Sequence, residues 1–422
     1  MSTPVGTPVG TPVSTPAGAP ASAPGGAPAS ASPGSPAAAP VVPSQGLPPA
    51  LRRPLGFPAG PGAPGPVAVV LGTRPEAIKL AEVVRRLGAA GLVVHTGQHW
   101  DPELWADVTA ELGLGTEPLP LGIGGGSRGQ QLGAAVSALD ALFAERRPSC
   151  VLVQGDTTAA LAGALAANTA GVPLVHVEAG LRSHDRRMPE EHHRVLVDHL
   201  ADLCCAPTAT AVANLRAEGV PDERILLTGN TVVESVHHLL PDADERARTA
   251  RELDLPEEFL LLTLHRPENA DNPDVLRRVF AELATVDLPV VFPAHPRTLR
   301  SLREHGLEGL LGPVRALAPV PPARFLALQA LARLVVSDSG GVQEEVSVLK
   351  KRLVVVRRST ERPEVLGTFA SLVPGGVRLG RAVREALAED PAALREVPSP
   401  YGDGSASRVV VESVVKLVTA LA

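Results

Sequence analysis

The chain of 422 residues contains few aromatic residues, few cysteines and no long uncharged apolar run. Aromatic residues make up 2% of the sequence and are not interleaved with basic residues, and the net charge is −6, which together exclude a nucleic-acid-binding surface. Cys150, Cys204 and Cys205 form neither a disulfide framework nor a C-x-x-C metal pair. The nearest candidate for a membrane span, residues 159–177, contains Asn168, Thr169, Gly171 and Pro173. We therefore expect a cytoplasmic protein with reduced thiols and no membrane partner.

Charge is absent altogether from the first fifty residues, which consist almost wholly of Pro, Ala, Gly, Ser, Thr and Val. Such a segment cannot bury enough apolar surface to offset the entropy that ordering would cost. We also do not expect a secretory signal in it, because no basic region precedes an apolar core. We predict a disordered tail over 1–65, with ordered structure beginning near Val67.

From Val67 onward, short apolar runs alternate with longer helical stretches. We expect strands at 67–71, 92–95, 150–153, 174–177, 203–206, 225–228, 259–263, 290–292, 334–336 and 353–356. We expect helices at 75–87, 102–112, 129–145, 158–170, 190–201, 242–252 and 273–286. This rhythm predicts α/β domains with doubly wound, Rossmann-like parallel sheets, and it restarts near residue 242. The expected domains are 66–238 and 239–404 with a ligand cleft between them, followed by a C-terminal helix within 405–422 that packs back across the hinge.

The segment around Ser339, Gly340 and Gly341 predicts a phosphate site. It joins an apolar run to an expected helix, whose free N–H groups and dipole would attract an anion, and glycines let a phosphate approach the backbone closely. Glu344 and Glu345 would lie in the first helical turn, where Glu345 could accept hydrogen bonds from ribose hydroxyls. The alternative is a plain strand–helix turn with a polar cap, which is the better interpretation of an isolated S-G-G.

Two cations near another expected helix start indicate a second anion contact. Arg74 and Lys79 lie in G-T-R-P-E-A-I-K, and both can reach a ligand at the helix N-terminus. Lys79 is the only lysine before Lys350 in an arginine-rich sequence. A capped helix with surface charges is the alternative for this segment taken alone.

Three carboxylates follow expected strands or open an expected helix in the first half: Asp156 in Q-G-D-T-T, Glu178 in H-V-E-A-G and Glu190 in P-E-E-H-H-R. Taken alone, Asp156 would more often be an N-cap and Glu190 a complement to the helix dipole. Burial after an apolar strand would raise the pKa of Glu178. Three converging carboxylates suit general acid/base work. His192 and His193 show no recognised metal-ligand spacing, so no metal is expected.

The second half places His265 after one expected strand and Arg362 in T-E-R-P-E. A lone histidine in such a place is more often a hydrogen-bonded core residue. Together with the S-G-G turn, His265 and Arg362 indicate phosphate ligands, so the second half is interpreted as the nucleotide-binding half.

In their order and spacing, these segments resemble the non-hydrolysing UDP-N-acetylglucosamine 2-epimerases over residues 67–422. The resemblance implies a glycosyltransferase-B architecture, a homodimer, no cofactor, and acid/base roles for Asp156, Glu178 and Glu190. It also implies the ligand contacts: Arg74, Lys79, His265 and Arg362 around the diphosphate, Ser339, Gly340 and Gly341 on phosphate, Glu345 on ribose, Phe325 on uracil, and Gln98 and His99 for a second, activating UDP-sugar.

The implied chemistry interconverts UDP-N-acetylglucosamine and UDP-N-acetylmannosamine without redox. If the anomeric C–O bond to UDP breaks first, cationic residues stabilise the leaving diphosphate and the C2 proton becomes acidic. A carboxylate removes that proton to give a 2-acetamidoglucal, and protonation on the other face with re-addition of UDP inverts C2. Two faces need two proton carriers, which suits a site with several carboxylates.

Several positions depart from the pattern of the resembled family: His193 stands in place of an Asn, Trp100 follows Gln98 and His99, Pro322 replaces an aromatic residue, and Arg358 replaces a smaller or acidic one. These departures leave the activator site and the exact sugar open. The alternatives are a C2 epimerase of a 2,3-diacetamido-uronic UDP-sugar, a hydrolysing epimerase, a glycosyltransferase-B-type transferase and a catalytically silent UDP-sugar sensor.

Overall fold

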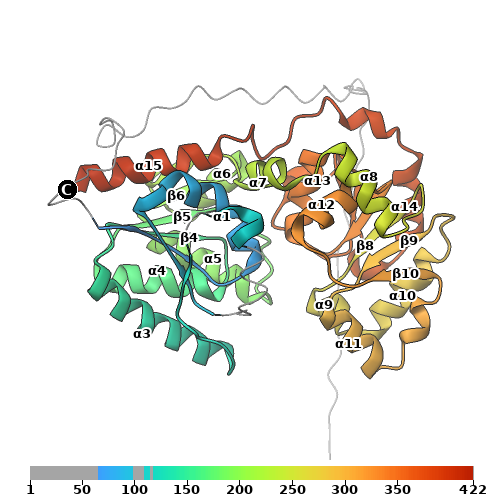
Figure 1. Ribbon diagram of the computed structural model, residues 1–422, viewed down its shortest axis with the longest axis horizontal. Coiled ribbons are helices and arrows are strands. Elements are labelled where there is room, and N and C mark those ends of the chain that lie inside the picture. Colours follow the sequence, from blue (N-terminus) through green and yellow to red (C-terminus); the bar gives the residue numbers. More distant parts are fainter. Residues whose placement is uncertain (1–64, 98–108, 115–116, 422) are drawn as a thin grey trace, which may run out of the picture. The chain divides into compact units, whose positions relative to one another are not determined.

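A computed structural model describes residues 65–97, 109–114 and 117–421 (Figure 1). The predicted tail lies almost wholly outside these residues, as do Gln98, His99 and most of the predicted helix 102–112. In the part of the chain that is described, no helix is both long and apolar enough to cross a membrane.

The first half of the chain forms a parallel sheet that has seven strands in the described residues, in the order β3-β2-β1-β4-β5-β6-β7. The strands are β1 Val67–Leu71, β2 Gly91–His95, β3 Leu119–Pro120, β4 Cys150–Gln154, β5 Leu174–Val177, β6 Leu203–Ala206 and β7 Ile225–Leu227. The helices of this half are α1 Arg74–Leu87, α3 Arg128–Arg146, α4 Thr158–Ala170, α5 Pro189–Leu200, α6 Ala209–Ala217 and α7 Val232–Leu239.

Helices cover both faces of this sheet, which explains why its central strands are apolar except at Gln154 of β4 and His176 of β5. Val67 and Val69 of β1 pack in one hydrophobic cluster with side chains of α1, whereas Ala68 and Val70 pack in another with side chains of α3 and α4. Alternate residues of a strand point to opposite faces, so both sets must be apolar. Figure 1 shows α3 and α4 on one side of the sheet and α1 with α15 (Ala406–Leu421) on the other.

The second half repeats this architecture with a parallel sheet of six strands among the described residues, in the order β10-β9-β8-β11-β12-β13. The strands are β8 Leu260–Thr263, β9 Val290–Pro293, β10 Val314–Leu317, β11 Leu334–Ser337, β12 Leu353–Val355 and β13 Ala370–Leu372. The helices are α8 Ala243–Glu252, α9 Pro267–Ala270, α10 Pro273–Leu283, α11 Pro296–Glu304, α12 Pro322–Leu331, α13 Gly340–Leu349 and α14 Leu379–Ala388.

The prediction of two doubly wound parallel sheets is confirmed, and strands β1 and β6 have the predicted bounds. The C-terminal helix α15 contacts α1 and α7 of the first half, and the Ser407 N–H donates to Glu234 Oε1 over 2.6 Å. One detail is wrong. Helix α13 begins at Gly340, and its first turn contains no acidic residue. Glu344 and Glu345 lie in the next turn, not in the first turn as predicted.

Each sheet has one point where the strand order reverses, between β1 and β4 in the first and between β8 and β11 in the second. At such a reversal, the loops after the two neighbouring strands run in opposite directions and a crevice forms between them. Ligands of doubly wound sheets bind in this crevice. Asp156 follows β4, His265 follows β8 and Ser339 follows β11, so the fold places these predicted residues at the two switch points.

Candidate active site

The start of α13 brings Gly340 against charged side chains. A Cβ atom at Gly340 would lie 2.8 Å from Arg362 Nη1 and 3.1 Å from Glu361 Oε1, so only glycine fits there without displacing them. At Gly341 an added Cβ would meet only Glu345 Oε1, at 3.8 Å. The Ser339 N–H donates to Ser337 Oγ over 3.0 Å. The turn therefore holds Arg362 beside the helix N-terminus, where a cation and free N–H groups would attract the same anion.

His265 is held in place by the buried carboxylate of Asp338. The backbone N–H of His265 donates to both Asp338 oxygens at 3.1 Å, and its ring Nδ1 lies 3.1 Å from Oδ1. Asn269 Nδ2 donates to Asp338 over 3.0 Å. Burial acts to raise the pKa of Asp338, but the hydrogen bond and charge of His265 and the donation from Asn269 lower that pKa overall. The imidazole is thereby anchored at Nδ1, and its side chain remains partly exposed.

A buried cluster of charges links residues that are far apart in the sequence. Lys79 Nζ lies 2.7 Å from Glu178 Oε2 and 2.8 Å from Glu344 Oε2. Arg362 donates from Nη2 to Glu178 over 2.9 Å and from Nε to Glu344 over 2.7 Å, while its Nη1 binds Glu361. The cluster thus brings together three predicted residues, Lys79, Glu178 and Arg362, with two carboxylates that were not predicted.

The pKa values of Glu178 and Glu344 shift in opposite directions. Burial and the neighbouring Glu344 raise the pKa of Glu178, against the opposing effect of Lys79 and Arg362. Burial also acts to raise the pKa of Glu344, but Arg362 and Lys79 lower it overall. The predicted rise for Glu178 is confirmed. Two nearby carboxyls whose pKa values shift in opposite directions are a feature of acid/base sites.

Asp156 is not the N-cap of α4, contrary to the interpretation favoured for this residue taken alone. Thr157 is the N-cap, and its side chain accepts a hydrogen bond from the Ala160 N–H over 3.0 Å. Asp156 instead extends its carboxylate to Arg194, whose Nε lies 3.1 Å from Oδ2 and whose Nη2 also binds that oxygen. The Asp156 side chain is 31% exposed, so it remains accessible to a ligand.

Glu190 lies half-buried in the first turn of α5, as predicted, beside the buried Glu191. Glu191 has a structural task. It accepts hydrogen bonds from the N–H groups of Ser183 and His184 and from Arg194 Nη1. Because these contacts occupy the Glu191 carboxylate, Glu190 is the better candidate of the two for contact with a ligand.

The remaining predicted residues have varied surroundings. Phe325 is half-buried on α12, and Arg74 is exposed at the start of α1. Glu345 accepts from Gln329 Nε2 over 2.5 Å, and burial raises its pKa. Gln98 and His99 lie outside the described residues, so their predicted role stays a prediction.

Two sets of charged contacts, one at Asp156 and one at Glu178, lie within electrostatic reach of each other. Asp156 binds Arg194, Glu361 helps to hold Arg194 in its cationic form, Glu361 binds Arg362, and Arg362 binds Glu178. Arg194 and Glu361 were not predicted. Both stand within the quoted motifs P-E-E-H-H-R and T-E-R-P-E, so the signal was present, but the sequence does not tell which members of a motif face inward.

A family model described as UDP-N-acetylglucosamine 2-epimerase matches residues 82–415, well over half of the chain. The chain belongs to this epimerase family. The UDP-N-acetylglucosamine 2-epimerase of Methanococcus maripaludis is 37% identical over an alignment of 361 residues that covers 82% of this chain and 98% of the relative. The UDP-2,3-diacetamido-2,3-dideoxy-D-glucuronate 2-epimerase of Pseudomonas aeruginosa is 34% identical, covering 83% of this chain and 99% of the relative.

The crystal structure of Methanocaldococcus jannaschii UDP-GlcNAc 2-epimerase in complex with UDP-GlcNAc and UDP is also similar. Its sequence is 35% identical, and the match covers 82% of this chain and 98% of that chain with a TM-score of 0.75. Membership in the epimerase family confirms the predicted resemblance, the glycosyltransferase-B-like fold class and the isomerase class. The roles of individual residues, the domain boundaries, the homodimer and the cytoplasmic location stay predictions.

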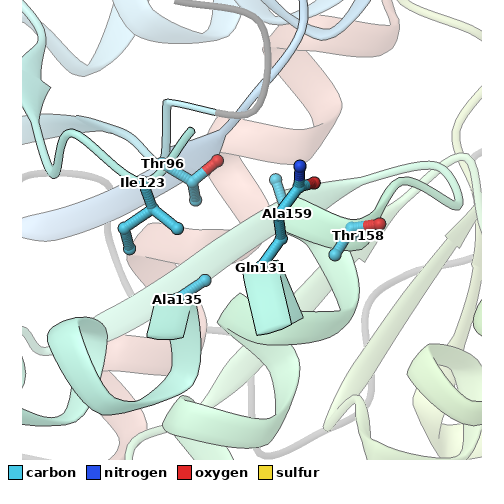
Figure 2. Close-up of a pocket in the computed structure, with 6 residues that line it drawn as sticks. All are labelled: Thr96, Ile123, Gln131, Ala135, Thr158 and Ala159. Atoms are coloured by element: carbon cyan, nitrogen blue, oxygen red, sulfur yellow. The ribbon is translucent and has the colours of Figure 1, made fainter. Parts of the chain in front are cut away.

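A small pocket of this epimerase-family chain has no residue of the charged cluster in its lining. Figure 2 shows its lining: Thr96, Ile123, Gln131, Ala135, Thr158 and Ala159. Thr96 follows β2 and Thr158 opens α4, so the pocket borders the carboxyl edge of the first sheet. None of the predicted acid/base carboxylates lines it. In the described residues, no group of three or more His, Cys, Asp or Glu side chains is placed to hold a metal ion.

Proposed function

We propose that the protein interconverts UDP-N-acetylglucosamine and UDP-N-acetylmannosamine by inversion at C2, through elimination and re-addition of UDP. The observation that carries this proposal is a pair of charged contact sets, Asp156 with Arg194 and Arg362 with Glu361 and Glu178, in which Glu361 also acts electrostatically on Arg194. Together they combine the cations needed by a leaving diphosphate with the carboxylates needed by a C2 proton. The family and the solved relative with bound UDP-GlcNAc and UDP support the choice of ligand.

The elimination step breaks the anomeric C–O bond, and the bonding electrons leave with UDP. The N-terminus of α13, with Arg362 beside it and His265 anchored on Asp338, would stabilise the developing negative charge on the diphosphate. A carboxylate then takes the C2 proton, which leaves the C1–C2 double bond of a 2-acetamidoglucal. In this proposal, side chains and the N–H groups at the start of α13 supply the stabilising charges, and carboxylates supply the proton acceptors.

Re-addition reverses the sequence on the other face of the sugar. A protonated carboxyl delivers a proton to C2, and the UDP oxygen forms the new bond to C1. The raised pKa of Glu178 suits a group that takes up a proton more readily than an ordinary carboxylate, whereas the half-buried Asp156 and Glu190 are accessible to the sugar. The three carboxylates therefore give the two faces separate proton carriers.

Turnover of UDP-N-acetylglucosamine in deuterated water, followed by NMR, tests the proposal. We expect UDP-N-acetylmannosamine with deuterium at C2. Free N-acetylmannosamine would identify a hydrolysing epimerase instead. The absence of C2 exchange, with and without a second UDP-sugar added as activator, would overturn the proposal for this substrate.

A C2 epimerase of a UDP-2,3-diacetamido-uronic sugar is the second candidate, because the Pseudomonas aeruginosa relative is nearly as similar in sequence as the Methanococcus maripaludis one. The same NMR experiment with that sugar nucleotide decides between them. The substrate that exchanges its C2 proton faster at equal enzyme concentration is the better one. Equal inertness of both substrates would favour the catalytically silent UDP-sugar sensor.

A further inference from the structure

Two imidazole rings hold consecutive carbonyl groups of the turn that carries Asp156. His176 Nε2 lies 2.9 Å from the Gly155 carbonyl oxygen, and His193 Nδ1 lies 2.9 Å from the Asp156 carbonyl oxygen. A carbonyl oxygen only accepts hydrogen bonds, so each of these ring nitrogens must carry the hydrogen. Gly155 adopts a φ of 68°, and its N–H donates to the Val177 carbonyl over 3.0 Å, so the turn is fixed from three sides.

His176 forms the rigid side of this arrangement. Its ring is fully buried, and Nδ1 lies 2.7 Å from Asp198 Oδ1. Asp198 also binds the Gly180 N–H and Arg182 Nη2. Burial acts to raise the pKa of Asp198, but His176 and Arg182 lower it overall, which keeps the carboxylate ionised as an acceptor. Both partners of the His176 ring are therefore acceptors, and both ring nitrogens donate.

His193 forms the side that belongs to α5. The same helix carries Glu190 three residues earlier and Arg194 one residue later. Residues three apart lie on one face of a helix, so His193 and Glu190 face the same way. Arg194 holds the carboxylate of Asp156 and His193 holds its backbone carbonyl. Helix α5 thus carries one candidate proton carrier and fixes the other at two points.

We propose that His193 is a positioning residue for Asp156, which sets the distance between the carboxylates of Asp156 and Glu190 through its hydrogen bond to the Asp156 carbonyl oxygen. This inference rests on the proposed function. His193 itself touches neither sugar nor diphosphate in the proposal, so its effect is on proton transfer and not on binding. An asparagine side chain can place an amide N–H where the imidazole Nδ1–H lies, whereas leucine fills the space without a donor.

The test compares His193→Leu and His193→Asn with the wild type, and uses His192→Leu as the matched control. His192 is the exposed neighbour on α5, and its ring contacts the Arg186 carbonyl oxygen at 3.0 Å. We expect His193→Leu to lower kcat by about tenfold to a hundredfold with KM changed by less than about threefold, because a misplaced catalytic group slows the chemical step. His193→Asn should recover most of the lost kcat, and His192→Leu should match the wild type.

Outcomes that overturn the inference differ from those that overturn the proposed function. If the wild type exchanges the C2 proton of no UDP-sugar, the proposed function is wrong, and so is the catalytic role of Asp156. If the wild type is active and His193→Leu is equally active, His193 does not position Asp156. The same conclusion follows if His193→Asn is as slow as His193→Leu, and in both cases the proposed function stands. Circular dichroism and the Tm of each variant show whether a loss of kcat reflects unfolding. Nitrogen-15 NMR of the wild-type histidines gives a separate check, since the inference requires a hydrogen on His193 Nδ1.

Discussion

Lys79 Nζ lies 2.9 Å from Glu178 Oε1 and 2.7 Å from Glu178 Oε2, a contact that joins residues 99 positions apart and buries both charges. Burial acts to lower the pKa of Lys79, but Glu178 and Glu344 raise it overall, so the ammonium group stays charged. The lysine is thus a structural counter-ion of the acidic cluster as well as a predicted phosphate ligand. Its two roles can be separated by experiment.

Removal of Lys79 should destabilise the fold strongly. In Lys79→Met, the carboxylates of Glu178 and Glu344 lose a buried cation, and breaking a buried ion pair costs about 3–5 kcal/mol. Urea unfolding with the midpoint and slope compared to wild type measures the loss. Arg86→Met is the matched control, because the Arg86–Glu82 pair is partly exposed and such pairs are worth about 0–1 kcal/mol. Equal losses in the two variants would contradict the buried network.

Glu76 should make stability depend on pH in the neutral range. Its carboxylate accepts hydrogen bonds from the Gly72 N–H over 3.0 Å and from Thr157 Oγ1 over 2.6 Å, yet burial raises its pKa from 4.5 to about 7. The folded state therefore holds a proton that the unfolded state has released, and this contribution to stability is lost as pH rises from 4.5 to about 7.

The loss amounts to at most about 3 kcal/mol, since one pKa unit corresponds to about 1.4 kcal/mol. Glu76→Gln should flatten the dependence of unfolding free energy on pH across that interval. Glu145→Gln, at an exposed position, should leave the dependence as it is in the wild type. A Glu76→Gln curve parallel to the wild-type curve would show that Glu76 titrates in its ordinary range.

Gly340→Ala and Gly341→Ala should differ although they are neighbours. The new Cβ at 340 would lie 2.8 Å from Arg362 Nη1, and Arg362 cannot yield freely because Glu178, Glu344 and Glu361 hold it. Overpacking of this kind costs about 1–3 kcal/mol. At 341 the nearest atom is 3.8 Å away, so the alanine fits. Thermal unfolding of the two variants measures the difference, and equal Tm values would show that Arg362 moves aside.

Asp156→Asn should separate catalysis from binding. The amide keeps the size of the side chain but cannot accept a proton, so we expect turnover to fall by at least about a hundredfold. Isothermal titration should give a Kd for UDP within about twofold of wild type, because the proposed diphosphate contacts lie elsewhere. Asp222→Asn, at an exposed position paired with Arg216, is the control. Unchanged turnover in Asp156→Asn would remove Asp156 from the acid/base set.

The elements that the sequence predicted well are those whose apolar runs are buried on both faces. β1 and β6 are fully buried and have the predicted bounds. β10 is half-buried at the edge of its sheet and was not predicted, since an edge strand need not be apolar at every position. β3 spans only Leu119–Pro120, which is too short to form a recognisable run.

In the candidate site, too, the sequence predicted some features and not others. Sequence order placed Asp156, Glu178, His265 and Ser339 after strands, and parallel strands bring such residues to one edge of each sheet. It gave Glu344 no role and assigned Glu345 to the ribose. The first is fully buried against Lys79 and Arg362, whereas the second is bound by Gln329. Which face of α13 turns inward depends on packing, and adjacent helical residues point about 100° apart.

The sequence by itself determined the parallel α/β architecture, the strand–turn–helix junctions and the residue types at them, because these depend on local periodicity and on glycine and proline positions. Tertiary structure decided which charges meet. The contacts of Lys79 with Glu178, of Arg362 with Glu344, and of His193 with the Asp156 carbonyl oxygen join segments that are distant along the chain. Such pairings follow from the packing of the sheets and helices, since neither partner's neighbours in sequence specify what it will touch.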